Sequence, residues 1–252
     1  MSLLRAEEVS KRFSGLSALD AVSLTVAPGE IVGLIGPNGA GKTTLFNCLY
    51  GVLAPDGGRI TFDGRDLAGL AVHRRARLGI GRTFQRIELF AGMTVRDHLL
   101  VAERARRGDG ALWKDLCNRS RPTSDERARA DATLGLLGLD DVADRPVESL
   151  SLGRGRLVEL GRALMIEPRL LLLDEPSSGL DHRETDEMAD VLDVVRRERG
   201  TAILLVEHDV AMVRRVTSRL YVLDFGQLIA DGPTAEVVAD ARVRQAYLGD
   251  TV

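Results

Sequence analysis

The sequence GPNGAGKTT at residues 36–44 follows a short apolar run, IVGLI, at residues 31–35 and leads into a predicted helix over 42–49. It fits the phosphate-loop pattern, in which a glycine and any four residues precede Gly-Lys-Ser/Thr. The glycines let backbone N–H groups turn toward phosphate oxygens, and the helix N-terminus adds positive potential. Lys42 can reach the β- and γ-phosphates, and the Thr43 hydroxyl can ligate Mg²⁺.

The alternative is a glycine-rich turn that binds no ligand. Four matched positions between a strand and a helix make a site for a nucleoside triphosphate the better interpretation. The nucleotide-binding residues predicted in this loop are Gly36, Asn38, Gly39, Ala40, Gly41, Lys42, Thr43 and Thr44.

Composition and charge limit the classes of protein to consider. The 252 residues are 44% hydrophobic and 28% charged, which is ordinary for a globular protein with one sizeable core. With 34 Lys and Arg against 37 Asp and Glu, the net charge is −3, so no global electrostatic argument favours a nucleic-acid partner. Cys48 and Cys117 form no CxxC pattern, which favours two reduced thiols over a disulfide or zinc site.

No stretch of the sequence predicts insertion into a membrane. Residues 1–10 contain acidic side chains and no long apolar region, so they do not resemble a signal peptide. No apolar run approaches the length that spans a bilayer. We therefore expect any membrane role to depend on a partner.

Around the phosphate loop the chain alternates predicted strands and helices, which is typical of an α/β fold. Apolar runs predict buried strands over 170–173 and 202–206, and helical spacing predicts helices over 155–165 and 182–199. Residues 85–150 interrupt this alternation with a mostly helical stretch, which contains a capping box at 94–97. Arginines in and before this stretch, among them Arg75 and Arg82, are expected on a solvated helix face rather than in a binding patch.

Two carboxylates follow the strand predicted over 170–173. Because Mg²⁺ on a nucleotide takes only one or two protein oxygens, Asp174 is the candidate metal ligand. Glu175 would point in a different direction and suits the base that orients the attacking water. The alternative, a turn or capping pair, is the weaker interpretation in a chain with a phosphate loop.

Three further residues are ambiguous when each is taken alone. His208 follows the next strand and can donate to a γ-phosphate, although such a histidine is more often structural. Gln85, at the end of a predicted strand, is usually a surface group. Phe13 could pack against a loop or stack on a nucleobase, and the residues alone favour packing.

Taken together, these motifs resemble the ATP-binding subunit of an ABC (ATP-binding cassette) transporter over essentially the whole chain. Leu150-Ser151-Leu152-Gly153 resembles the family signature, and Ser178-Gly179-Leu180-Asp181 resembles its D-loop. The resemblance assigns Gln85 to the Q-loop, where it would also ligate Mg²⁺, and His208 to the switch position. It makes Phe13 the aromatic that stacks on adenine, which reverses the packing interpretation.

The resemblance implies an α/β fold: a P-loop NTPase cassette core with an antiparallel β subdomain and an inserted helical subdomain. The single domain would span 1–252, with the core at 1–84 and 151–252 and the helical subdomain at about 85–150. It also implies ATP and Mg²⁺ as cofactors and a homo- or heterodimer of ATPase subunits. In that dimer, Ser151 and Gly153 would cap the γ-phosphate bound at Lys42 of the other subunit, and Asp181 of the D-loop would also be a nucleotide-binding residue.

A narrower resemblance is to the branched-chain amino-acid importer ATPases. It rests on residues 81–85, 89–95, 206–209 and 246–249. It implies integral-membrane permease subunits, an extracytoplasmic solute-binding protein, a position at the cytoplasmic face of the cell membrane, and no nucleic-acid partner. The alternatives are another ABC importer or exporter, a soluble cassette acting on DNA or the ribosome, and a low-turnover switch.

The signature departs from the family pattern at one position. Arg154 stands where a glutamine usually follows the signature glycine, and Gly155 comes next. We expect the arginine to add charge near the nucleotide and Gly155 to loosen the start of the helix, which would retune or weaken hydrolysis.

Overall fold

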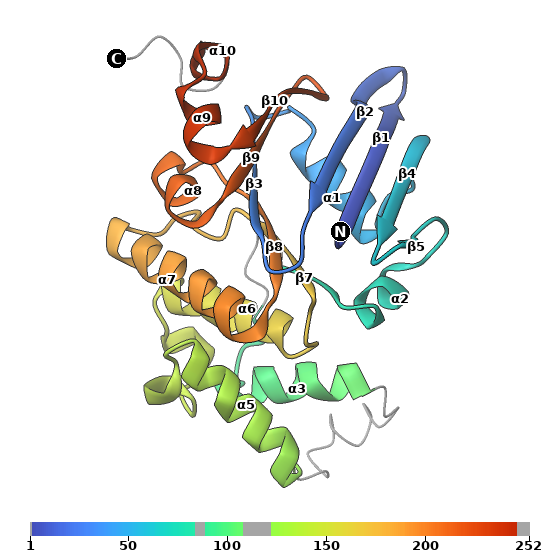
Figure 1. Cartoon of the computed structure of the whole chain (residues 1–252). Helices are drawn as coiled ribbons and strands as arrows, with labels where there is room; N and C mark the ends of the chain where they lie inside the picture. The colour runs from blue at the N-terminus through green and yellow to red at the C-terminus, as the bar shows by residue number, and fades with distance from the viewer. Residues whose placement is uncertain (1, 84–88, 108–121, 246–252) are drawn as a thin grey trace.

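The fold consists of two β-sheets with helices packed against them (Figure 1). The computed structural model describes residues 2–83, 89–107 and 122–245. Gln85, Cys117 and the segment 246–249 therefore lie outside the described residues.

The larger sheet has six strands in the order β10-β9-β3-β8-β7-β6. All neighbours pair in parallel except β10, which runs antiparallel to β9. Parallel strands end at one edge, so the residues that follow β3, β6, β7 and β8 meet there. The strand bounds are β3 Ile31–Ile35, β6 Ile80–Arg82, β7 Leu170–Asp174, β8 Ala202–Val206, β9 Arg219–Asp224 and β10 Gln227–Pro233.

The apolar runs become central strands because both faces of this sheet are covered. Along β7, Leu170 and Leu172 belong to one buried cluster and Leu171 and Leu173 to another, and each is at most 1% exposed. Side chains alternate between the faces of a strand, so a continuous run of leucines fills two cores at once.

The first of these cores lies between the two sheets. The smaller sheet is antiparallel with the order β2-β1-β4-β5, and helix α1 (Lys42–Tyr50) lies between it and the larger sheet (Figure 1). Phe46 of α1, fully buried, packs in this core with residues of both sheets. The strand bounds are β1 Leu4–Phe13, β2 Leu16–Val26, β4 Gly57–Phe62 and β5 Arg65–Asp66.

The second core lies between the larger sheet and helices that include the predicted insertion. Helices α3 and α5 lie together at the lower end of the view, next to α6 (Figure 1). As predicted, Thr94 caps α3: its hydroxyl accepts from the Asp97 N–H at 3.1 Å. The bounds are α3 Val95–Arg107, α5 Ser124–Leu136, α6 Leu152–Leu164 and α7 His182–Arg199, with short 3₁₀ turns at Asp140–Val142 and Val147–Ser149.

The predicted α/β fold is confirmed, and two details differ from the sequence analysis. Arg75 and Arg82 are not on a solvated face: Arg75 is 4% exposed and the Arg82 side chain 5%. The helix α8 (Val210–Val216) was not predicted. The remaining helices are α2 (Val72–Arg77), α9 (Thr234–Ala239) and α10 (Ala241–Val243).

Across the described ranges, no helix combines the length and apolar character needed to cross a membrane.

Candidate nucleotide-binding site

The phosphate loop connects β3 to α1 at the carboxyl edge of the larger sheet. Lys42 is 6% exposed, and its ammonium donates to the carbonyls of Gly36 at 2.6 Å and Pro37 at 2.9 Å. Burial lowers the pKa of Lys42, and the charges of Glu175 and Asp174 oppose that shift. The lysine side chain is thus held along the loop, near both carboxylates.

Two glycines are required by close packing of this loop. Gly36 has φ +154°, and a Cβ there would lie 2.0 Å from the Leu223 carbonyl oxygen. Gly41, just before α1, has φ +105°, and its Cβ would lie 2.5 Å from the Ala18 oxygen. The loop therefore rests directly on the end of β9 and on β2, which leaves Thr43 and the tip of the loop exposed.

The two predicted carboxylates lie at the same sheet edge and have different partners. Asp174 is 5% exposed, and its Oδ2 accepts from Nη2 of Arg82 at 3.2 Å. Burial raises the pKa of Asp174, and the charge and hydrogen bond of Arg82 counteract part of that rise. Glu175 Oε1 lies 2.6 Å from Nε2 of His208. The sequence prediction that Asp174 and Glu175 point in different directions agrees with this pairing.

A left-handed backbone conformation produces the divergence. Glu175 has φ +51°, which is unusual for a residue with a side chain. Its N–H still donates to the Val206 carbonyl of β8 at 2.9 Å. The carboxylate is consequently directed toward the end of β8, where His208 follows the strand. Backbone strain of this kind is concentrated at functional sites.

The signature and D-loop residues form a second group around Glu184. Ser151 caps α6 by accepting from the Arg154 N–H at 3.3 Å, and Asp181 caps α7 by accepting from the Glu184 N–H at 2.8 Å. The Gly153 N–H donates to Glu184 Oε1 at 3.3 Å. A cavity of about 260 Å³ is lined by these residues.

Arg154 lines this cavity, but its side chain also reaches Asp141 in the 3₁₀ turn Asp140–Val142. Its guanidinium lies 2.8 Å from Asp141, and both side chains are partly exposed. Helix α6 begins at Leu152 and continues through Gly155 to Leu164, so the expected loosening by Gly155 is not seen. Gly155 is buried within α6, where tertiary packing offsets the low helix propensity of glycine.

Phe13 lies apart from both groups, at the end of β1. It pairs with Leu16 across the hairpin turn and is 44% exposed, with the Lys11 ammonium 5.6 Å from the ring centre. An exposed ring is consistent with a stacking platform and does not fit the packing interpretation. Gln85 lies outside the described residues.

Sequence reasoning missed two residues that support the site. Arg82 holds Asp174, as above, and Glu207 is a 2% exposed carboxylate at the end of β8. Glu207 accepts from the N–H groups of Ser177 at 2.8 Å and His208 at 3.0 Å, which joins the segments after β7 and β8. The sequence shows only that each is a polar residue at the end of a predicted strand. It does not show which residues Arg82 and Glu207 contact.

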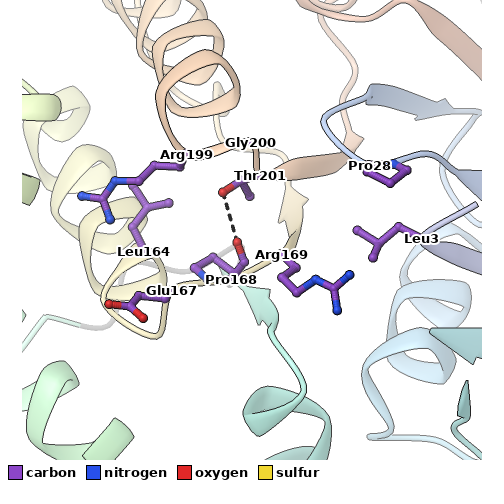
Figure 2. Close-up of a pocket in the computed structure, with 9 residues that line it drawn as sticks. All are labelled: Leu3, Pro28, Leu164, Glu167, Pro168, Arg169, Arg199, Gly200 and Thr201. Atoms are coloured by element: carbon purple, nitrogen blue, oxygen red, sulfur yellow. Dashed lines mark hydrogen bonds between the residues drawn. The ribbon is translucent and has the colours of Figure 1, made fainter. Parts of the chain in front are cut away.

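A larger cavity lies at the opposite edge of the sheet (Figure 2). It measures about 450 Å³, and its lining includes Pro28, Pro168 and Thr201, which precede β3, β7 and β8. Thr201 donates to the Pro168 carbonyl at 3.0 Å, which closes one wall. Ligands of open α/β sheets bind at the carboxyl edge, so this cavity is separate from the nucleotide site.

Comparison with known proteins identifies related chains. A family model described as "ABC transporter" matches residues 19–178, and one described as "Branched-chain amino acid ATP-binding cassette transporter" matches residues 227–252. The chain is 41% identical over 251 residues to the high-affinity branched-chain amino acid transport ATP-binding protein LivG of Salmonella typhimurium, covering 98% of each chain. It is 36% identical to the lipopolysaccharide export system ATP-binding protein LptB of Haemophilus influenzae, covering 99% of this chain and 98% of LptB.

A solved structure extends the likeness to the whole fold. The crystal structure of the ADP conformation of MJ1267, an ATP-binding cassette of an ABC transporter, matches with a TM-score of 0.88 and 34% identity. The match covers 99% of this chain and 100% of that one. The phosphate loop, the paired carboxylates and the signature segment occur here in one such cassette. The chain therefore belongs to the ABC transporter family.

Proposed function

We propose that this chain hydrolyses ATP to drive uptake of branched-chain or related amino acids through a membrane permease. The observation that carries the proposal is the convergence of Lys42, Asp174 and Glu175 at one sheet edge. The C-terminal match at residues 227–252 and the likeness to LivG support the choice of solute class.

In this proposal the phosphate loop holds the triphosphate. Free N–H groups in the first turn of α1 and the Lys42 ammonium supply positive charge to the phosphates. Phe13, exposed at the end of β1, would stack on the adenine ring. Helix α1 begins directly after the loop, so these donors are fixed before the nucleotide arrives.

The residues at this edge fit a nucleotide-bound Mg²⁺. Asp174 and Thr43 offer a carboxylate and a hydroxyl oxygen, which are hard donors that Mg²⁺ accepts, and Gln85 would add an amide oxygen. Bound there, Mg²⁺ would neutralise charge on the transferring phosphoryl group.

Glu175 would orient the attacking water and accept its proton. Its hydrogen bond to His208 holds the carboxylate in place, while its left-handed backbone turns it away from Asp174. We propose that His208 also senses the γ-phosphate, because its ring is hydrogen-bonded to Glu175, the residue that would orient the attacking water. One carboxylate then binds the metal and the other serves as the base, so the two roles do not compete.

The second half of the site would come from another ATPase subunit, identical or related. Ser151, Gly153 and Asp181 lie around their own cavity, at the start of α6 and of α7. We propose that they cap the nucleotide held by the phosphate loop of the partner. ATP would favour the closed dimer because only that state contacts it on both sides.

The remaining partners follow from transport. The subunit would sit at the cytoplasmic face of the membrane, bound to integral-membrane permease subunits and served by an extracytoplasmic solute-binding protein. The segment containing Gln85 and the helices α3 and α5 would pass the closure to the permease.

The test is reconstitution of the chain with the permease that co-purifies with it. We expect ATP-dependent uptake of leucine, isoleucine or valine into vesicles, and no uptake without ATP. Export of a lipid-linked solute by the same complex would favour the second candidate, an exporter subunit, which the 36% identity to LptB keeps open. ATP binding without phosphate release would favour a low-turnover switch.

A further inference from the structure

The proposed roles do not account for Arg82, a buried cation beside Asp174. Arg82 is the last residue of β6, three positions before Gln85, and its side chain is 5% exposed. Its Nη1 donates to Asn47 Oδ1 at 2.7 Å, and its Nη2 donates to Asp174 Oδ2 at 3.2 Å. A buried arginine with two side-chain acceptors on different elements is held in one orientation.

The two acceptors lie on the two elements that carry the proposed metal donors, so Arg82 connects these elements. Asp174 ends β7, and Asn47 lies in α1, four residues after Thr43. Residues four apart in a helix lie on the same face, so Asn47 is the neighbour of Thr43 one turn along. Arg82 therefore spans the distance between the Asp174 carboxylate and the face of α1 that presents the Thr43 hydroxyl.

Aromatic packing keeps the guanidinium in this position. The guanidinium carbon of Arg82 lies 5.8 Å from the ring centre of Phe46 and 5.9 Å from that of Tyr50, both on α1. The planar group is thus packed against the helix as well as bonded to it. A lysine at this position would keep the charge but could not reproduce the fork that reaches both acceptors.

We propose that Arg82 is a positioning residue that fixes the Asp174 carboxylate and helix α1 relative to each other, so that Asp174 and Thr43 present their oxygens to one nucleotide-bound divalent cation. This inference rests on the proposed ATPase function.

The alternative is that Arg82 serves only the stability of the core, and a matched control separates the two roles. Arg75 is also buried, and it donates to the carbonyls of Cys48 and Leu49 at the end of α1, both at 2.8 Å. It supports the same helix without contacting Asp174. A purely structural role would therefore make Arg82→Lys and Arg75→Lys behave alike.

The experiment measures nucleotide affinity of the full chain with and without the metal. A fluorescent ATP analogue is titrated in EDTA and then in increasing Mg²⁺, with wild type, Arg82→Lys, Asn47→Ala and Arg75→Lys. Thermal unfolding of each variant confirms that it is folded. For Arg82→Lys we expect affinity in EDTA within about twofold of wild type and a half-saturating Mg²⁺ concentration raised about tenfold or more, the factor that 1.4 kcal/mol represents.

Asn47→Ala should raise the half-saturating Mg²⁺ concentration less than Arg82→Lys does. Arg75→Lys should lower thermal stability and leave the half-saturating Mg²⁺ concentration unchanged. An unchanged Mg²⁺ requirement in Arg82→Lys, or an equal rise in Arg75→Lys, would overturn the positioning role. If wild type itself showed no Mg²⁺-dependent binding, the proposed ATPase function would fail as well. The two failures are thus distinguishable.

Discussion

At the scale of single residues, Glu175 and Asp174 are adjacent in the chain and have separate environments. Asp174 is enclosed beside Arg82, and Glu175 is bonded to His208. The buried carboxylate of Asp174, held by Arg82, suits a metal ligand, and the carboxylate of Glu175, held by His208, suits a base. This division of roles makes Glu175 the most informative residue to change.

We expect Glu175→Gln to leave ATP binding intact and to lower phosphate release about 100-fold or more, which is the contribution of a positioned base. The amide keeps the shape and can still bond to His208, but it cannot accept the proton of water. Nucleotide affinity and single-turnover phosphate release measure the two effects. Glu198→Gln, an exposed change in the last turn of α7, is the control. Near-normal release in Glu175→Gln would remove this residue from the catalytic role.

Arg154 is the residue at which the structure changes the initial expectation. Its guanidinium pairs with Asp141 on the protein surface, and surface ion pairs contribute little to stability. We expect Arg154→Gln to have ATPase activity within about twofold of wild type in the assembled transporter, because the lost pair is solvated. Asp141→Asn, which frees the arginine, is the companion variant. A large gain or loss in Arg154→Gln would mean that the side chain leaves Asp141 and reaches the nucleotide.

At the scale of elements, buried strands and capped helices were the features most predictable from the sequence. The leucine run of β7 and the capping box of α3 each contain their own local signal. Helix α8 has only seven residues and was missed, because so short a segment shows little periodicity. Arg82 was misplaced because its partners, Asn47 and Asp174, lie 35 and 92 residues away. Such tertiary pairing has no signature in a single sequence.

The start of α3 contains a histidine whose protonation state is fixed by its contacts. His98 is 1% exposed, accepts from the Phe90 N–H at Nε2 over 2.8 Å, and is bonded at Nδ1 to the Thr94 carbonyl over 2.9 Å. Nε2 must be unprotonated to accept, so the folded ring is neutral with its proton on Nδ1. Burial lowers the pKa of His98 below its ordinary value of 6.5. The hydrogen bond to the Thr94 carbonyl opposes that shift, the nearby charge of Arg162 adds to it, and the charges of Asp97 and Glu148 oppose it.

The sign of the resulting pH effect follows from linkage. Below about pH 6.5 the unfolded chain binds a proton at His98 that the folded chain resists, so stability decreases as pH falls through that range. We expect wild type to lose about 1 kcal/mol more unfolding free energy than His98→Asn between about pH 7.5 and 5.5. Urea unfolding at both pH values measures the difference. Equal losses in the two proteins would show that the fold does not oppose protonation of His98.

At the scale of the whole molecule, the proposed ATP-contacting residues fall into two groups on different elements. Lys42, Asp174 and Glu175 gather at the carboxyl edge of the sheet, whereas Ser151 and Gly153 lie at the start of α6. In the chain alone, the Gly153 N–H donates to Glu184. A γ-phosphate arriving from another subunit would have to take over that donor. Under the proposed head-to-tail pairing, each ATP site would be complete only when the signature group of one chain meets the phosphate loop of the other.

Mixing two inactive variants tests this pairing directly. Lys42→Ala removes the phosphate-loop half of a site, and Ser151→Arg blocks the signature half, so each variant alone should be inactive. In a mixed pair, one site would combine the intact loop of the second variant with the intact signature of the first. Random pairing of equal amounts should then restore about a quarter of wild-type phosphate release, because half of the pairs are mixed and each has one intact site.

Two further mixtures control for effects that are not specific to the composite site. Lys42→Ala mixed with Glu175→Gln impairs the same half of every site, so that mixture should stay inactive. Ser151→Arg mixed with wild type shows whether one blocked site silences its neighbour. If the first mixture remained inactive while the wild-type mixture kept one working site, the two halves would belong to the same chain. If phosphate release were restored in the mixture of Lys42→Ala with Ser151→Arg but not in that of Lys42→Ala with Glu175→Gln, each ATP would have to lie between two subunits. No single chain in the restored mixture carries both intact halves of a site.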